Sequence, residues 1–289
     1  MAEISAAAVM KLRKMSGQGM MDCKKALEET NGNLEEAMTL LRKKGMATLA
    51  KRADRDTTEG KVLCVTGDNG KTASMATLCC ETDFVTNSDD FISTGEALNN
   101  YIIACPSDNS VEELLKTEDT GGKSLSQLIT ETVSKIGEKI EIGDYARFKL
   151  TSPGLISTYV HFNGKIGVML EIETSTQAVA DNAAFALIAK DICMHIAAIN
   201  PLALDSSGIP AEVIEKEKAI AADQMKDKPA NMIEKIVEGK MKKFYAENCL
   251  LSQGFVKDDK VSVEKVLADS AKTAGGTAKI KRFVRLAIG

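Results

Sequence analysis

Apolar residues recur at helical spacing in three stretches near the start of the chain, and short polar breaks separate the stretches. The breaks are residues 16–19 and Asn31–Gly32. Asn33, with Glu36 three residues later, forms an N-cap and capping-box pair for the third stretch. The apolar positions are Val9, Leu12, Ala26, Leu27, Leu34, Ala37, Met38 and Leu41. This pattern predicts a three-helix bundle over residues 1–55, followed by a charged linker to about residue 60.

A second pattern, with period two and short apolar runs, begins at Lys61. Residues 62–66 and 72–80 flank a turn at 67–70, and this order predicts a β-hairpin. A helix is expected to follow from about Ser88 to Ala104.

The same order of strand, turn, strand and helix recurs later in the chain. Residues 155–162 and 166–173 flank Asn163–Gly164, and a helix is expected from about 182 to 198. An offset of 94 residues aligns the two copies, with nine identities in the 36 positions from 69 to 104. Such an internal repeat predicts two related lobes built from one supersecondary unit.

The repeat defines how the rest of the chain is organised, and the expected fold class is α+β. The first lobe comprises residues 61–150, and the second comprises 151–209 together with 246–289. An amphipathic helix is expected over 124–140, and a strand over 280–288.

Residues 210–245 interrupt the second lobe. Pro210 opens a helix that is expected to run to about Met225, a turn follows at 226–229, and a return helix covers 230–245. This order predicts an antiparallel helical hairpin that projects from the lobe.

Composition excludes several function classes. A net charge of -4 argues against whole-chain attraction to nucleic acid or an anionic membrane. No apolar run is long enough to span a bilayer and the start has no signal-peptide pattern, so we expect a cytoplasmic protein. Seven cysteines without a Cys-x-x-Cys motif indicate a reducing compartment, and two histidines offer little to a metal centre.

Enzyme motifs are also missing from the sequence. Gly67–Thr72 ends in Gly-Lys-Thr, but Val65 stands where a phosphate loop needs its first glycine, and residues 73–80 read as a strand. No nucleophile elbow or dinucleotide fingerprint occurs. We therefore expect a protein that is not an enzyme and that needs no cofactor and no metal.

The segment Glu81–Val85 is the strongest candidate for function. Phe84 follows Asp83 where a strand turns towards a helix, so the ring could be displayed on a short connection. The alternative is that Phe84 belongs to the core and Asp83 caps a turn. The second lobe has Gln177 and Ala178 at the equivalent positions, which favours the displayed ring.

Two further features allow more than one interpretation. His195 lies among apolar residues of a helix, which favours a capped or core-edge histidine over a catalytic base and leaves a contact role at the helix surface open. The first domain is rich in lysine and arginine, which fits either a solvated rim or an RNA- or ribosome-binding module.

Five segments in order resemble the bacterial elongation factor Ts family, the guanine-nucleotide exchange factors of the GTPase elongation factor Tu. The similar segments are Leu12–Arg13 with 16–27, Thr82–Val85, Lys135–Ile140, Met194–Ala198 and Glu238–Phe244. One departure is Glu81, which stands where many members have glutamine. The resemblance covers nearly the whole chain.

The resemblance implies a ubiquitin-associated-like bundle, a core of two related subdomains, and a coiled coil inserted in the second. It also implies binding to elongation factor Tu, in its GDP-bound and nucleotide-free states, and GDP release through displacement of Mg²⁺ and of phosphate contacts. No membrane and no direct nucleic-acid partner are expected. The residues that the resemblance assigns to partner binding are Leu12, Met20 and Met21, then Thr82, Asp83, Phe84 and Val85, and His195.

Overall fold

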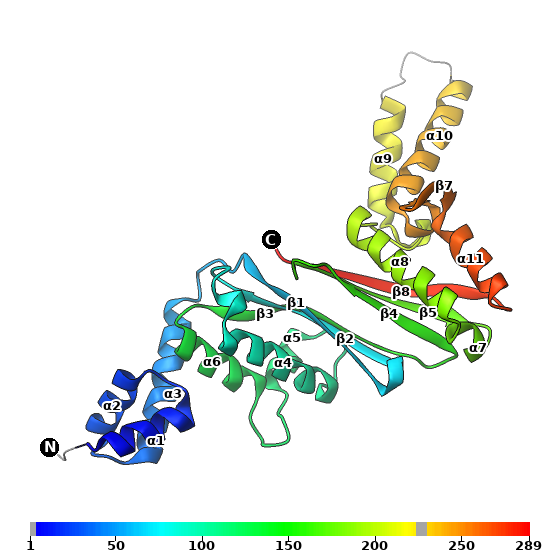
Figure 1. Cartoon of the computed structure of the whole chain (residues 1–289). Helices are drawn as coiled ribbons and strands as arrows, with labels where there is room; N and C mark the ends of the chain where they lie inside the picture. Colours follow the sequence, from blue (N-terminus) through cyan, green and yellow to red (C-terminus); the bar gives the residue numbers. More distant parts are fainter. Residues whose placement is uncertain (1–3, 224–229) are drawn as a thin grey trace.

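The structure is a computed structural model that describes residues 4–223 and 230–289. The chain begins with a bundle of three helices, α1 (Ala6–Ser16), α2 (Met20–Glu29) and α3 (Leu34–Lys51) (Figure 1). The predicted N-cap of α3 is confirmed, because Asn33 Oδ1 accepts the Glu36 N–H at 3.2 Å. The capping box is not formed, since the Glu36 carboxylate accepts from Asn33 Nδ2 at 2.8 Å while the Asn33 backbone N–H donates to the Thr30 carbonyl.

The first lobe is an antiparallel sheet covered on one face by helices (Figure 1). Its strands run in the order β1-β2-β3, and Ala76, Leu78 and Ile142 point into a core shared with the helices. The elements are β1 (Glu59–Gly67), the 3-10 turn η1 (Asp68–Gly70), β2 (Thr72–Cys80), the 3-10 turn η2 (Val85–Asn87), α4 (Asp89–Ala104), α5 (Val111–Lys116), α6 (Leu125–Ile136) and β3 (Ile140–Lys149).

The helix expected over residues 124–140 is shorter than predicted. Ser124 and Gln127 form a capping box at the start of α6, but Gly137 adopts a left-handed conformation with φ of 80° and ends the helix. The chain then enters β3 at Ile140, so the last predicted helical residue belongs to the sheet. The strand after Gly67–Gly70 rules out a phosphate loop there, since that motif requires a helix.

The second lobe repeats this architecture with sheet order β4-β5-β8. β2 and β5 start 94 residues apart and have the same pattern of buried and exposed positions. α6 and α11 also correspond, because each begins at a serine N-cap, Ser124 or Ser262, and leads into the last strand of its sheet, β3 or β8. Their offset is 138 residues. The elements are β4 (Gly154–Val160), β5 (Ile166–Thr174), α7 (Gln177–Ala180), α8 (Ala183–Ile199), α11 (Val263–Thr273) and β8 (Ala278–Ala287).

An insertion between α8 and α11 carries the helical hairpin, which projects from the second lobe (Figure 1). The predicted turn at 226–229 lies outside the described residues, and α10 extends beyond the predicted end at residue 245. The small β6–β7 hairpin was not predicted. The inserted elements are η3 (Ser206–Gly208), α9 (Ala211–Asp223), α10 (Ala230–Asn248), η4 (Leu250–Ser252), β6 (Gly254–Phe255) and β7 (Asp258–Ser262).

The two sheets pack face to face, and the helices lie on the outer faces (Figure 1). Gly167 on β5 marks the closest approach, because a Cβ there would lie 2.5 Å from Val62 Cγ1 and 2.6 Å from Met75 Sδ. The side chains between the sheets are Val62, Ala73, Met75, Phe148, Ile156, Met169, Leu286 and Ile288. None of the described helices is long and apolar enough to cross a membrane.

Replacing Gly167 should weaken the contact between the lobes. We expect Gly167→Val to lower the free energy of unfolding by about 1–3 kcal/mol, because its side chain overlaps Val62 and Met75. Urea unfolding followed by circular dichroism measures the change. Gly239→Val on α10, where an added Cβ meets nothing within 4 Å, is the matched control and should keep its midpoint. An unchanged midpoint for Gly167→Val would contradict close packing here.

Candidate partner-binding site

The connection between β2 and α4 displays an aromatic ring beside a carboxylate. The Phe84 side chain is 85% exposed, and Asp83 is exposed next to it. No hydrogen bond or ion pair joins the Asp83 carboxylate to another described residue. Val85 is buried in the core of the first lobe, so its side chain offers little surface, and its partner contact stays a prediction. We call Asp83 and Phe84 the tip.

Hydrogen bonds on both sides fix the backbone of the tip. Before it, the Thr82 amide and hydroxyl donate to the two oxygens of Glu138, at 3.1 and 2.8 Å. After it, the Thr86 hydroxyl donates to the Asp83 carbonyl at 2.7 Å. Ser88 then caps α4. The tip is therefore a rigid display, in which the entropy of ordering the loop is lost on folding and not on binding.

The Glu81 carboxylate ties the linker to the base of the tip. It forms ion pairs with Arg52 at 2.6 Å and Arg55 at 2.7 Å, and it accepts the Lys139 amide hydrogen at 2.6 Å. Burial alone would raise the pKa of Glu81, but the Lys139 amide and the two guanidinium groups outweigh it and lower the pKa to about 2. Glu81 is therefore a charged junction between the linker, β2 and the segment after α6.

The second lobe shows that the fold does not require the ring. Ala178 occupies the position of Phe84 and is exposed, whereas Val179 is buried as Val85 is. Gln177, at the position of Asp83, is hydrogen-bonded to Asp181 at 2.9 Å. The same turn thus forms without an aromatic residue, and an exposed Phe adds nothing to the core. This comparison favours a role for Phe84 outside its own chain.

The bundle offers a second apolar surface at the start of α2. Met20 and Met21 are 48% and 63% exposed, and we call them the methionine surface. Leu12 was expected beside them, but its side chain is completely buried between the helices of the bundle. The Leu12 side chain therefore has no exposed surface, and its direct contact with a partner stays a prediction.

His195 is also buried, which corrects the expectation that it lies on the surface facing a partner. Its Nδ1 accepts the Val256 amide hydrogen at 3.1 Å, and its Nε2 is 2.9 Å from Gln253 Oε1. Burial lowers the pKa of His195, while the bond to Gln253 opposes the change. The neutral ring has both nitrogens satisfied, so the core-edge interpretation of this histidine is confirmed.

Two aromatic residues in the β4–β5 turn were not predicted as site residues. Phe162 is 93% exposed, and its ring lies 4.4 Å from that of His161. Lys61 connects this turn to η2, the 3-10 turn that follows the tip, since its side chain lies against Gly164 and its Nζ donates to Asn87 at 3.1 Å. An aromatic residue inside a polar turn is the sequence signal that could have identified Phe162.

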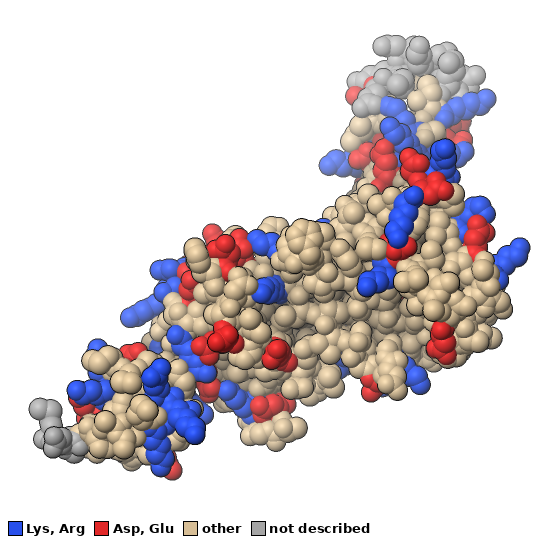
Figure 2. All heavy atoms as spheres, in the orientation of Figure 1, with Lys and Arg blue, Asp and Glu red and all other residues tan. Residues whose placement is uncertain are grey.

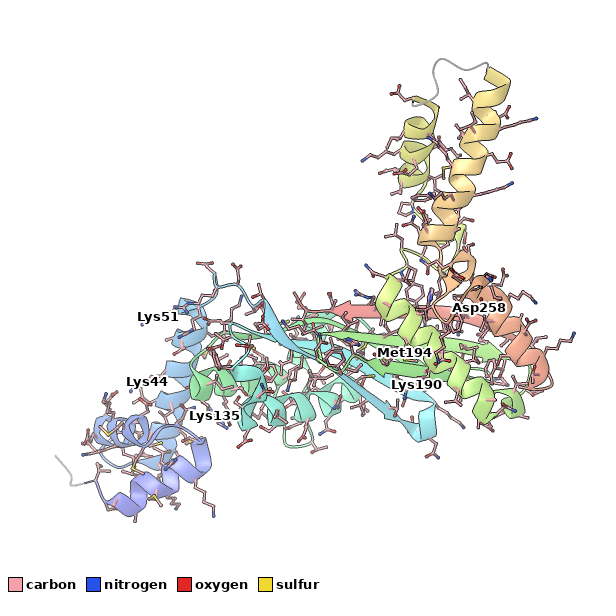
Figure 3. All side chains as sticks on the ribbon, turned by 45° about the horizontal axis from the view of Figure 1, so that its top comes forward. Lys44, Lys51, Lys135, Lys190, Met194 and Asp258 are labelled. Carbon is pink, nitrogen blue, oxygen red and sulfur yellow. The ribbon has the colours of Figure 1, made fainter. Side chains whose placement is uncertain are left out.

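A groove of about 600 Å³ adjoins this turn on the second lobe. Its lining is mainly apolar and includes Tyr159, Met194 and Val256, with the cations Lys257 and Arg285 among the lining residues. Met194, labelled on α8 in Figure 3, is one of the residues that line the groove. In residues 4–223 and 230–289, no three His, Cys, Asp or Glu side chains gather to hold a metal ion.

A two-lobed α+β body with an exposed aromatic tip on one lobe and a helical hairpin on the other defines a class of protein, and comparisons identify it. The Elongation factor TS family model matches residues 81–289. Elongation factor Ts of a Nitratiruptor species is 46% identical over 288 residues, covering 99% of this chain and 93% of the relative. Elongation factor Ts of Christiangramia forsetii is 42% identical over 292 residues, with full coverage of both chains. The chain therefore belongs to the elongation factor Ts family of translation elongation factors.

Glu81 should make the free energy of unfolding depend on pH in the acidic range. Its folded pKa lies below the ordinary value of 4.5, so its contribution is present above about pH 4.5 and is lost as the pH falls towards about 2. We expect Glu81→Gln to lower the free energy of unfolding by about 1.5–3 kcal/mol at pH 7. The difference from the wild type should shrink as the pH falls through that window.

Chemical denaturation between pH 3 and pH 7 measures this difference. Glu112→Gln is the control, because Glu112 is fully exposed in an ion pair with Lys116 and should leave the profile unchanged. A difference between Glu81→Gln and the wild type that stays constant over the whole pH range would contradict the assignment.

Proposed function

We propose that this protein is a guanine-nucleotide exchange factor that binds elongation factor Tu in its GDP-bound state and promotes release of GDP. It acts by binding and not as an enzyme, and it needs no cofactor of its own. The observation that carries the proposal is the tip: Phe84 is 85% exposed on a fixed loop whose copy in the second lobe has alanine. Membership of the elongation factor Ts family supports the choice of partner.

The chemistry of the tip suits displacement of a nucleotide-bound metal. A GTPase holds its nucleotide through phosphate contacts and a Mg²⁺ ion that depends on neighbouring loops. Phe84 would insert between structural elements of the partner, and the unpaired Asp83 carboxylate would engage groups near the Mg²⁺ site. Loss of the metal and of phosphate contacts then lets GDP leave. Coupling is reciprocal, so a newly bound GTP expels the factor.

The contact energy of the tip alone is too small to account for a large acceleration of GDP release. A thousandfold acceleration of release needs a barrier lower by about 4 kcal/mol, whereas burying one Phe side chain contributes about 1.5–3 kcal/mol. Met20, Met21 and Phe162 are exposed apolar residues that can supply further contact area. The groove lined by His161 offers a concave surface on the other lobe for additional contacts.

An RNA- or ribosome-binding role for the bundle is the second candidate. Figure 2 shows lysine and arginine side chains gathered over the bundle, which is the surface that this role would use. However, residues 1–55 contain no aromatic residue, so the bundle has no platform for stacking bases. RNA binding that weakens steeply with salt would support this role, and nucleotide exchange is favoured over it.

Phe84→Ala tests the tip. We expect it to slow stimulated GDP release about 10- to 100-fold, because about 1.5–3 kcal/mol of contact energy is lost. Thermal stability should not change, since the ring is exposed. The measurement mixes the factor with elongation factor Tu carrying labelled GDP and follows release of the label.

Leu187→Ala provides the matched control. Leu187 is a large apolar residue of α8 with 65% of its surface exposed, and it lies on the lobe that lacks the tip. This variant should release GDP at the wild-type rate. Equal rates for Phe84→Ala and the wild type would remove the ring from the mechanism.

A further inference from the structure

The bundle is held against the first lobe by a close contact between α3 and α6. Gly45 of α3 makes this contact possible, because a Cβ there would lie 3.0 Å from Ser134 Cβ and 3.1 Å from the Thr130 carbonyl oxygen. The ion pair of Arg42 with Glu131, at 3.8 Å, lies at the same junction. In Figure 3, Lys44 and Lys51 mark the course of α3 from the bundle to the lobe, with Lys135 of α6 nearby.

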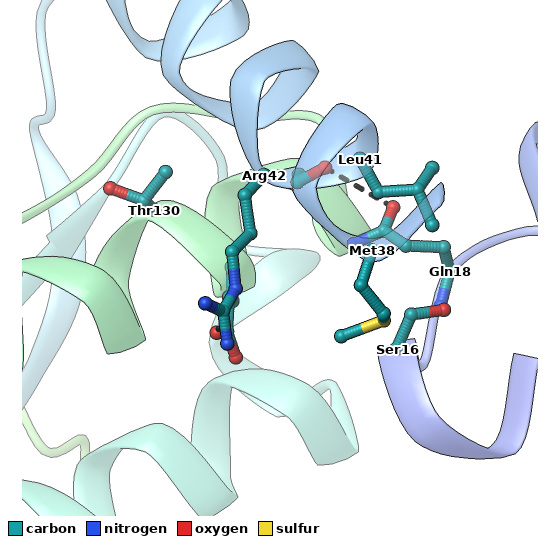
Figure 4. Close-up of a pocket in the computed structure, with 8 residues that line it drawn as sticks. Ser16, Gln18, Met38, Leu41, Arg42 and Thr130 are labelled. Carbon is teal, nitrogen blue, oxygen red and sulfur yellow. Dashed lines mark hydrogen bonds and ion pairs between the residues drawn. The ribbon is translucent and has the colours of Figure 1, made fainter. Parts of the chain in front are cut away.

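α6 also reaches the loop that precedes the methionine surface. Gln18 is only 6% exposed, and its Oε1 accepts a hydrogen bond from the Ser134 hydroxyl at 3.2 Å. The backbone N–H of Gln18 donates to the Ser16 hydroxyl at 3.2 Å, which closes a tight turn in the loop. Figure 4 shows Ser16 and Gln18 on the bundle side of this junction and Thr130 on α6. Gln18 stands two residues before Met20, so this bond helps to fix the start of α2.

The residues that follow Ser134 hold the tip. Lys135 lies over Gly17 and also forms an ion pair with Asp90, at 3.7 Å, at the start of α4. Glu138 accepts both hydrogen bonds from Thr82, and the Lys139 amide donates to Glu81. Within the short stretch 134–139, Ser134 and Lys135 therefore contact the loop before the methionine surface. Glu138 and Lys139 contact the residues that lead into the tip.

We propose that Ser134–Lys139 is a positioning segment, which holds the methionine surface at a fixed separation from the tip so that one partner molecule engages both. The inference rests on the proposed exchange function. Two surfaces on a rigid frame bind one partner with a high effective concentration, because binding of the first brings the second into place. A loosely attached bundle would lose this advantage without losing any contact residue.

Gly45→Leu tests the positioning segment in the full chain. The larger side chain would separate α3 from α6 and displace the bundle, while the residues of the tip and of the methionine surface are themselves unchanged. We expect the half-saturating concentration of the factor in GDP release to rise about tenfold, with a maximal rate within about twofold of the wild type. A simple loss of the tip would lower the maximal rate instead.

Gly239→Leu is the matched control, since it introduces the same side chain on a helix where a Cβ meets nothing within 4 Å. Small-angle X-ray scattering supplies a readout that does not depend on the partner, because a displaced bundle increases the maximum dimension of the molecule. Gln18→Ala is a second, milder variant that removes the bond to Ser134. We expect its half-saturating concentration to rise about two- to fivefold.

A displaced bundle with a wild-type half-saturating concentration would overturn the positioning role. If Gly45→Leu does not fold or keeps its bundle docked, the decision falls to Gln18→Ala, and an unchanged half-saturating concentration there overturns the proposal. These results leave exchange by the wild type intact and so affect the positioning role alone. A wild-type protein that does not stimulate GDP release would instead overturn the proposed function, and the positioning role with it.

Discussion

Two sheets can pack face to face only if one leaves room for the side chains of the other, and Gly167 provides that room for Val62 and Met75. The contact brings the β4–β5 turn against β1, where the Val62 amide donates to the Gly164 carbonyl at 2.7 Å. A buried carboxylate reinforces the junction: Glu171 on β5 pairs with Arg282 at 2.6 Å, and Arg282 lies over the ring of Phe148 in the other sheet. The face-to-face packing therefore brings Lys61 into contact with Gly164, in the turn that carries Phe162, and with Asn87, three residues after the tip.

Much of this fold could be predicted because its signals are local. The strands flanking Gly67–Gly70 follow period two, and the repeat at an offset of 94 residues places β5 and α8 correctly. The sequence could not reveal α11 in the same way, because its partner α6 lies at a different offset, 138 residues. β3 was missed for a related reason: the left-handed Gly137 divides what reads as one amphipathic run.

In the candidate site, too, some features could be predicted from the sequence and others could not. Exposure of Phe84 could be predicted because the second lobe supplied an internal comparison with Ala178. Burial of Leu12 and His195 agrees with the apolar helical pattern around each residue, whereas their roles in partner binding came from the family resemblance alone. The contacts of residues 134–139 with Gln18 and Thr82 span more than 50 residues of chain in each case, so only the folded structure reveals that one segment serves both surfaces.

The insertion in the second lobe has a consequence for how the hairpin can vary. Its two ends meet, since the Leu202 amide donates to the Asn248 carbonyl at 2.9 Å and Ala203 forms a parallel bridge with Cys249. Whatever lies between these ends can lengthen, shorten or change its outward face while the sheets keep their register. Related chains are therefore free to diversify this arm independently of the body that carries it.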